Sequence, residues 1–294
     1  MIISVTIISI ILFFYIRWES SNIVWLKPKH SYRVIGSEML GKEEVIEQQD
    51  GTKIRTKSIG NGQPVVLAHD YGTSLLTWNL LARELIQSGF KVIVFDQRGH
   101  CKSTIGKSGV SSQSMITAYR DVLNHYDVKE GILVGHGMGG FLAIVFMQTY
   151  PELVQNRLKS TILISSYASI LDKQTVSKWL YNLSVKTGIF HYLTRIQTFG
   201  FQYGKSFLGN KLDKNIIKAY LKSYNYNNHK KLSPILNAIN RENYSNNLDK
   251  IDIPCTIISG THNNRIPSYH SRELANPLTK SKVVYIEGKG HLLN

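Results

Sequence analysis

Cysteine, proline and acidic side chains are all scarce in this sequence. Only two cysteines, Cys101 and Cys255, occur among 294 residues. Two are too few for a disulfide framework, which favours a reducing compartment. The sequence has seven prolines, no low-complexity tract and no internal repeat, and so gives no sign of a linker. A chain of this length with one continuous pattern favours a single large domain.

The shortage of acidic residues leaves the chain strongly basic. Asp and Glu number 20 against 35 Lys and Arg, so the formal net charge is +15. The basic residues form no compact run and no motif that reads nucleic acid, which argues against a nucleic-acid partner. A solvated basic surface is the simplest explanation, and attraction to anionic lipid is the next.

Charge is absent from the first 16 residues, which are almost wholly apolar. The run reaches residue 18 if Arg17 extends its charge to the membrane interface, and a spanning helix needs about 17 residues or more. No basic residue precedes the run and bulky residues end it, unlike a cleaved signal peptide. Because the positive charges follow the run, we expect residues 1–18 to be a single-pass anchor with the domain facing the cytoplasm. A signal peptide is the second interpretation.

Apolar patterns along the rest of the chain predict an α/β fold. Residues 45–59, with Asp50-Gly51 as a turn, indicate a hairpin. Strands are predicted at 64–69, 91–96, 132–134, 158–165, 253–260 and 282–287, and helices at 75–87, 112–126 and 141–150. This alternation predicts a mostly parallel sheet with helices on both faces. Residues 167–248 hold helical fragments without a long buried strand, so we expect a helical lid between two sheet strands.

The stretch from Gly131 to Leu142 organises the chain. An apolar strand is followed at once by glycines and then by an apolar helix, which predicts a very tight turn between them. Gly135 and Gly139 supply the small side chains that such a turn needs. The pattern resembles the nucleophile elbow G-x-S-x-G, in which the central residue is the nucleophile. Here the central residue is Gly137, so the nucleophile position is vacant.

Further motifs in the same order resemble the α/β-hydrolase fold superfamily, in its lipase, esterase and epoxide-hydrolase-like branch, over residues 43–294. His69-Asp-Tyr-Gly72 resembles the family's His-Gly-x-Gly loop. The resemblance implies an oxyanion hole made by the backbone N–H groups of Tyr71 and Met138. Asp70 replaces a glycine, and its carboxylate would oppose an oxyanion unless it points away.

A second loop, Asp96-Gln-Arg-Gly-His-Cys-Lys-Ser103, resembles the family's Asp-x-Arg-Gly-x-Gly-x-Ser loop. We expect Asp96 and Arg98 to form a structural pair. Cys101 stands at the second glycine, where a thiol of lowered pKa could act as a substitute nucleophile. The resemblance argues against that role, because this loop braces the site in the family.

The remaining two positions of the family's catalytic triad follow near the C-terminus. Gly260 to Pro267 resembles the loop that carries the acid, with Asn263 at the acid position, and Gly288 to Leu292 resembles the loop that carries the base, His291. Asparagine can orient an imidazole but does not stabilise an imidazolium by charge. His136 and His262, beside the nucleophile and acid positions, are expected to serve packing.

Losing the nucleophile alone costs about 10⁶ in rate in a subtilisin-type enzyme. We therefore expect a membrane-anchored hydrolase-fold protein that is a probable pseudoenzyme, binding a small apolar ligand, an ester or a partner, without metal or cofactor. The alternative is an active hydrolase or lyase in which His291 activates water or abstracts a proton. A basic membrane-surface protein with an unused pocket is the third hypothesis.

Overall fold

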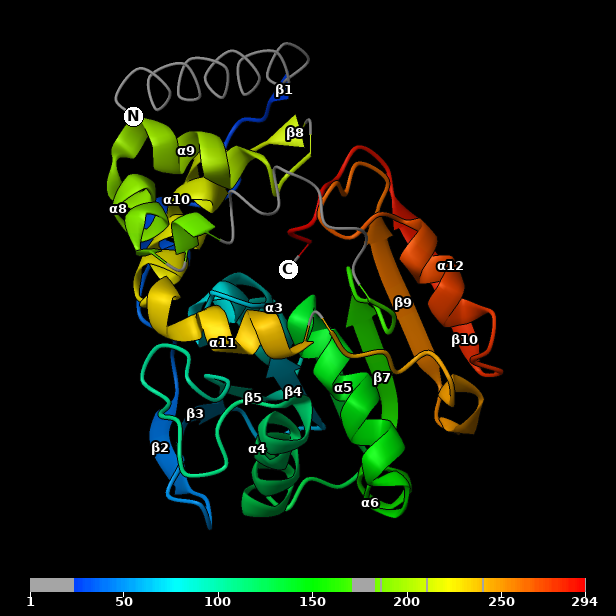
Figure 1. The fold of residues 1–294 in the computed structure, drawn as a ribbon. Coiled ribbons are helices and arrows are strands. Elements are labelled where there is room, and N and C mark those ends of the chain that lie inside the picture. Colours follow the sequence, from blue (N-terminus) through cyan, green and yellow to red (C-terminus); the bar gives the residue numbers. More distant parts are fainter. Residues whose placement is uncertain (1–23, 171–182, 186, 210, 240, 294) are drawn as a thin grey trace.

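The computed structural model describes residues 24–170, 183–185, 187–209, 211–239 and 241–293, and an eight-stranded sheet lies at its centre (Figure 1). The strand order is β10-β9-β7-β6-β4-β5-β3-β2. The strands are β2 (Lys42–Glu47), β3 (Lys53–Ile59), β4 (Pro64–Ala68), β5 (Lys91–Phe95), β6 (Gly131–His136), β7 (Leu158–Ile164), β9 (Cys255–Gly260) and β10 (Ser281–Ile286).

The sheet is parallel except where β3 pairs with β2 and β5. The predicted hairpin at residues 45–59 and the mostly parallel sheet are thereby confirmed. β4, β5 and β6 consist of nearly continuous apolar runs because strands in the middle of a parallel sheet are buried on both faces. β4 and β6 are hydrogen-bonded neighbours, with Ala68 opposite Gly135. The loops that follow these two strands therefore begin side by side.

Helices pack on both faces of the sheet. The 3-10 helix η1 (Leu75–Trp78) and α3 (Asn79–Gln87) pack on one face, where Leu75, Trp78 and Ala82 join a core with β4 and β5. The other face carries α4 (Ser112–His125), α5 (Met138–Thr149) and α12 (Tyr269–Ala275), and α6 (Pro151–Arg157) follows α5. The helix predicted at 75–87 is split because Ser74 caps a 3-10 turn before the α-helix begins.

Where the structure describes it, the predicted lid is largely helical. It follows β7 in the chain, and most of its helices stand apart from β7 and β9, above α3 in the view of Figure 1. It contains α8 (Ile189–Arg195), α9 (Gln197–Lys205), α10 (Lys214–Asn225) and α11 (His229–Ile239), and the 3-10 helix η2 (Leu248–Lys250) follows it. The aromatic side chains of Phe190, Phe207, Tyr220 and Tyr224 form a cluster separate from the sheet's two cores, whereas α11 packs into one of those cores. A short strand, β8 (Lys211–Leu212), pairs with β1 (Val24–Trp25) at the start of the described chain.

Residues that precede the predicted start of the domain at 43 also pack on it. The Asn79 side-chain amide donates to the carbonyls of Val34, Ile35 and Ser37. Lys222 of the lid donates to the Gly36 carbonyl. The segment containing α2 (Tyr32–Ile35) therefore links α3 to α10.

No helix within the described ranges is both long and apolar enough to cross a membrane. The predicted anchor, residues 1–18, lies outside those ranges.

Candidate functional site

The strand–turn–helix elbow is formed as the sequence predicts. Gly137 lies between β6 and α5 with φ 53° and ψ −116°, and its N–H donates to the Ile164 carbonyl at 3.0 Å. A Cβ added to Gly139 would overlap the Ala68 carbonyl, so glycine is required where the end of β4 approaches α5. The backbone of a nucleophile elbow is present, without a nucleophile on it.

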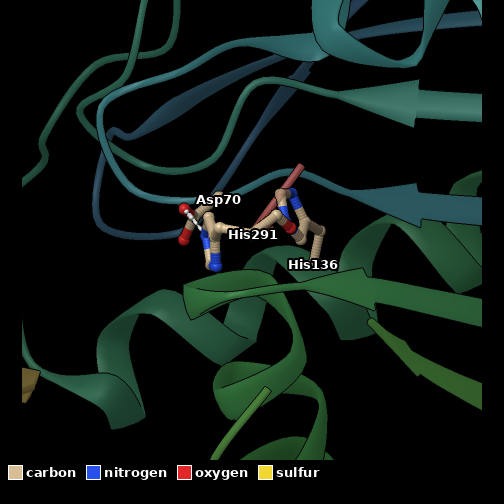
Figure 2. A group of neighbouring side chains, drawn as sticks. All are labelled: Asp70, His136 and His291. Carbon is tan, nitrogen blue, oxygen red and sulfur yellow. Dashed lines mark hydrogen bonds and ion pairs between the residues drawn. The ribbon is translucent and has the colours of Figure 1, made fainter. Parts of the chain in front are cut away.

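The Asp70 carboxylate occupies the space beside Gly137. A Cβ added to Gly137 would overlap Oδ1 and Cγ of Asp70. Oδ1 accepts a hydrogen bond from the Met138 N–H at 2.7 Å, and Oδ2 lies 2.8 Å from His291 Nε2 (Figure 2). Asp70 therefore points into the oxyanion hole, and the Met138 N–H that the sequence predicted as an oxyanion donor already binds an anion.

The position of this carboxylate favours its ionised form. Met138 is the first residue of α5, and the exposed N–H groups at a helix N-terminus stabilise negative charge. Burial alone would raise the pKa of Asp70, but the hydrogen bonds that the carboxylate accepts from His291 and from the Met138 N–H help to hold that pKa below its ordinary value. The site thus carries a fixed anion where an acyl-transfer enzyme needs space for a transient one.

Asn263 fixes the protonation of His291. Its Oδ1 accepts hydrogen bonds from the Arg265 and Ile266 N–H groups, both at 3.0 Å, so its Nδ2 must face His291 Nδ1, 3.3 Å away. An amide nitrogen only donates, so Nδ1 is the acceptor and Nε2 carries the proton. His291 Nε2 therefore donates to Asp70. In a serine triad an acidic residue accepts from Nδ1, which leaves Nε2 free as the base. Here the direction of the hydrogen bonds is reversed, because Nδ1 accepts and Nε2 donates.

Asp70, His136 and His291 are the candidate metal ligands, with one donor atom each and all three atoms within 4.8 Å of one another (Figure 2). The two imidazole rings, however, are inclined by only 34° with centroids 4.6 Å apart, and His136 Nε2 donates to the His291 carbonyl at 2.9 Å. Lone pairs in two nearly parallel rings do not converge on one ion. Burial lowers the pKa of His136 to about 4, so it is neutral at pH 7. Its hydrogen bond to the His291 carbonyl helps to orient that loop.

Backbone hydrogen bonds attach the lid to the loop that carries His291. The Gly290 N–H donates to the Leu208 carbonyl, and the Leu292 N–H donates to the Phe207 carbonyl. The side chain of Asn227, which is 2% exposed, donates to the carbonyls of Gly72 and Thr73 and accepts from the Cys101 N–H. The site is closed in consequence: the His291 side chain is 3% exposed and that of Asp70 is 14% exposed.

The Asp96 loop differs from the prediction in its ion pairs. Asp96 pairs with Arg55 at 3.3 Å, and Arg98 pairs with Asp50 at 2.7 Å, so the expected pairing of Asp96 with Arg98 is wrong. The buried carboxylate of Asp96 instead accepts from Arg55 and from the Leu75 N–H. The loop also contacts the loop after β4, because the Gln97 N–H donates to His69 Nε2 and His100 Nε2 accepts from the Gly72 N–H.

Cys101 is not a substitute nucleophile. Burial raises the pKa of its thiol to about 12, so the reactive thiolate is not populated near neutral pH. His262 is exposed, with its imidazole 3.1 Å from the Thr261 hydroxyl. The Tyr71 ring packs edge-on against His100. Its N–H as an oxyanion donor stays a prediction.

Sequence analysis overlooked two residues that shape the site. Asn227, in the lid, carried no motif that could have identified it. Ser165, after β7, has φ 47° and donates through its hydroxyl to the His291 carbonyl at 2.9 Å. A serine directly after a predicted buried strand was the available signal for this second residue.

Comparisons with known proteins agree with this architecture. A non-heme chloroperoxidase, CPO-A1 of Kitasatospora aureofaciens, is 23% identical over 254 residues, which cover 83% of this chain and 90% of that protein. A protein of Mycobacterium phage D29 is 27% identical over 113 residues, only 41% of its own length. An esterase of Exiguobacterium antarcticum superposes with a TM-score of 0.71 at 22% identity, covering 86% of this chain and 92% of that one.

The family assignment rests on the match to a family model. Residues 63–294 match the alpha/beta hydrolase fold family, which is most of the chain. The chain therefore belongs to the α/β-hydrolase fold family.

Proposed function

We propose that this protein has lost serine-type acyl transfer and uses the remodelled centre to bind a small apolar molecule. The observation that carries the proposal is the Asp70 carboxylate, which fills the nucleophile position and binds the Met138 N–H. A tetrahedral oxyanion would compete with this fixed anion for the same donor. The loss of the hydroxyl, the acid and the free oxyanion donor together disfavours ester hydrolysis.

The arrangement also disfavours His291 as a base toward water. Its Nε2 proton is directed at Asp70 Oδ2, and its Nδ1 faces the Asn263 amide. Accepting a second proton at Nδ1 would set two donors against each other and remove a hydrogen bond. The alternative of a hydrolase or lyase driven by His291 is therefore the weaker of the two.

An apolar recess between η1 and α10, which adjoins the remodelled centre only through Leu292, is the place we propose for the ligand. It has a volume of about 40 Å³ and is lined mainly by Leu76, Leu80, Ile216, Tyr220 and Leu292. Leu292 directly follows His291 in the chain, and Ile216 and Tyr220 belong to α10 of the lid. A ligand of more than a few atoms would require α10 to move outward.

We further propose that residues 1–18 anchor the protein in a membrane with the lid turned toward it. The uncharged apolar run followed by basic residues supports the anchor. β1, which follows this run, pairs with β8 of the lid. Ile189, Tyr192 and Ile196 of the lid are more than half exposed, so an apolar contact surface exists on that side.

A fluorophosphonate probe that labels activated serines tests the loss of acyl transfer. The wild-type chain is expected to remain unlabelled and to hydrolyse short activated esters no faster than a His291→Ala variant. Ester turnover that depends on His291 would contradict the proposal and favour the water-activating alternative.

A further inference from the structure

Two segments that are far apart in the sequence lie side by side in the fold. β1 pairs with β8, which directly precedes α10 (Figure 1). In the first turn of α10, Asn215 Nδ2 donates to the His30 carbonyl at 2.9 Å, and in its last turn the Lys222 ammonium donates to the Gly36 carbonyl at 2.6 Å. The residues that follow β1 therefore run along α10 from its first turn to its last.

Exposed basic side chains line both of these segments. Three follow β1, and two lie on α10, where a spacing of four residues places them in one stripe with Lys222. These residues are Lys27, Lys29, Arg33, Lys214 and Lys218, and we call them the basic patch. Because Lys222 contacts the Gly36 carbonyl, the stripe borders the segment that follows β1. The fold thus gathers a basic cluster that forms no run in the sequence.

The two segments hold almost no acidic residues. Residues 24–37 contain no Asp or Glu, and residues 211–231 contain only Asp213. Asp213 is 6% exposed, and its carboxylate caps α10 by accepting from the Asn215 N–H at 2.8 Å. Like charges four residues apart destabilise a helix. An anionic partner would therefore stabilise α10 when it binds beside the stripe of lysines.

We infer that the basic patch docks on the anionic headgroups of a lipid bilayer. Basic clusters next to a membrane-spanning segment attract acidic lipids, and Lys27 follows soon after the predicted anchor at residues 1–18. Tyr32, in the same segment, is exposed and supplies an aromatic side chain of the kind enriched at membrane interfaces. The inference rests on the membrane orientation in the proposed function, because it names the lipid class that the anchored domain contacts.

Hydrogen exchange of the full chain in the presence of lipid vesicles tests the proposal. Vesicles that contain phosphatidylserine should slow exchange over residues 26–37 and α10 relative to vesicles of phosphatidylcholine alone. The expected factor is about ten when lipid is present at about ten times its dissociation constant. Salt at about 1 M shortens the Debye length to about 3 Å and should remove the difference. Equal exchange with the two kinds of vesicle would overturn the proposal.

Variants that remove charge show whether the basic patch carries the effect. Lys27→Gln/Lys29→Gln/Lys218→Gln should weaken docking about 100-fold, since each basic residue near an anionic surface strengthens binding about fivefold. The matched control removes the same charge at three exposed lysines outside the two segments, Lys53→Gln/Lys107→Gln/Lys159→Gln. The control should keep the slowed exchange. Loss of protection in both variants alike would assign the effect to the charge of the whole molecule and overturn the proposal.

The anchor and the basic patch give separate readouts in the same experiment. Failure of the anchor would appear as full-length chain that does not sediment with phosphatidylcholine vesicles, while phosphatidylserine would still slow exchange over the basic patch. Slowing of exchange in these segments by a short DNA duplex, but not by phosphatidylserine, would overturn the proposal in favour of a nucleic-acid surface.

Discussion

At the scale of single residues, Asp70 and Asn263 together reverse the hydrogen-bond direction of the site. Asp70 accepts from His291 Nε2 and from the Met138 N–H, while Asn263 donates toward His291 Nδ1. Each substitution alone would leave an imidazole with one unsuitable partner. Because the two occur together, Nδ1 faces a hydrogen-bond donor and Nε2 faces an acceptor.

Replacing Asp70 should therefore destabilise the fold more than a surface carboxylate does. In Asp70→Asn, the NH₂ group of the new amide would face either His291 Nε2–H or the Met138 N–H, so two donors would oppose each other. This should cost about 1–3 kcal/mol of unfolding free energy. The exposed pair of Asp252 and Lys280 should contribute at most about 1 kcal/mol. Urea unfolding of Asp70→Asn and Asp252→Asn compares the two. Equal losses of unfolding free energy would show that the Asp70 carboxylate is not held by these donors.

Three buried histidines should make the protein sensitive to mild acid. Burial lowers the pKa of His69 and His136 to about 4 and that of His100 to about 3. Because these values lie below the ordinary value of about 6.5, the unfolded chain binds more protons between pH 4 and 6.5, and stability falls as pH drops through that window. For His136, the difference between about 6.5 and about 4 corresponds to about 3 kcal/mol of stability lost by pH 4.

The pH dependence can be assigned to one side chain. His136→Gln should flatten the loss of unfolding free energy between pH 7 and pH 5, whereas His262→Gln, at an exposed position, should leave it unchanged. Asp70 does not affect the slope between pH 7 and pH 5. Its pKa is lowered in the folded state, so the carboxylate is ionised in both the folded and the unfolded chain above its ordinary pKa of about 4. An unaltered pH slope in His136→Gln would contradict the assignment.

At the scale of elements, one side chain ties the lid to the loops of the sheet. Asn227 joins the end of α10 to Gly72, Thr73 and Cys101. The apolar cluster around α9 and α10 is separate from the cores of the sheet. This part of the lid is attached by such bonds, by the strand-like contact between residues 207–209 and 289–292, and by packing of α10 on α2 and η1, whereas α11 packs into the core of the sheet. An element attached in this way can open without unfolding the sheet.

Asn227→Ala should loosen the lid selectively. The change leaves two buried carbonyls and one N–H without partners and should cost about 2–3 kcal/mol. Hydrogen exchange in α10 is expected to accelerate while exchange in β4 and β6 stays slow. Lys218→Ala, at an exposed position of α10, is the control. Uniform acceleration over the sheet and the lid would show that they open as one unit.

At the scale of the whole molecule, the local motifs predicted most of the fold. The elbow, the hairpin and the alternating strands are set by short stretches of sequence, and each was found where it was expected. The direction of the Asp70 side chain could not be predicted, because it depends on the meeting of loops 68 residues apart. The sequence could not predict which ring nitrogen of His291 donates either, since this depends on two backbone N–H groups that fix the orientation of the Asn263 amide. The pairing of Asp96 with Arg55 joins distant strands in the same way.

The predicted membrane anchor determines where the full-length chain should be found. The full-length protein should sediment with membranes, and a variant lacking residues 1–17 should be soluble and folded, because the deletion ends before β1 and leaves its pairing with β8 intact. Aggregation of the truncated protein would argue against a separable anchor. Glycosylation at the Asn182-Leu-Ser site in eukaryotic cells would contradict the cytoplasmic orientation.

The central claim is that Asp70 occupies the place of the lost nucleophile, and restoring a serine there tests it most directly. We would compare fluorophosphonate labelling of Gly137→Ser/Asn263→Asp with that of the same variant carrying Asp70→Gly. The serine side chain and the Asp70 carboxylate would overlap, so labelling should be weak or absent in the first protein and strong in the second. Equal labelling of both proteins would contradict the claim.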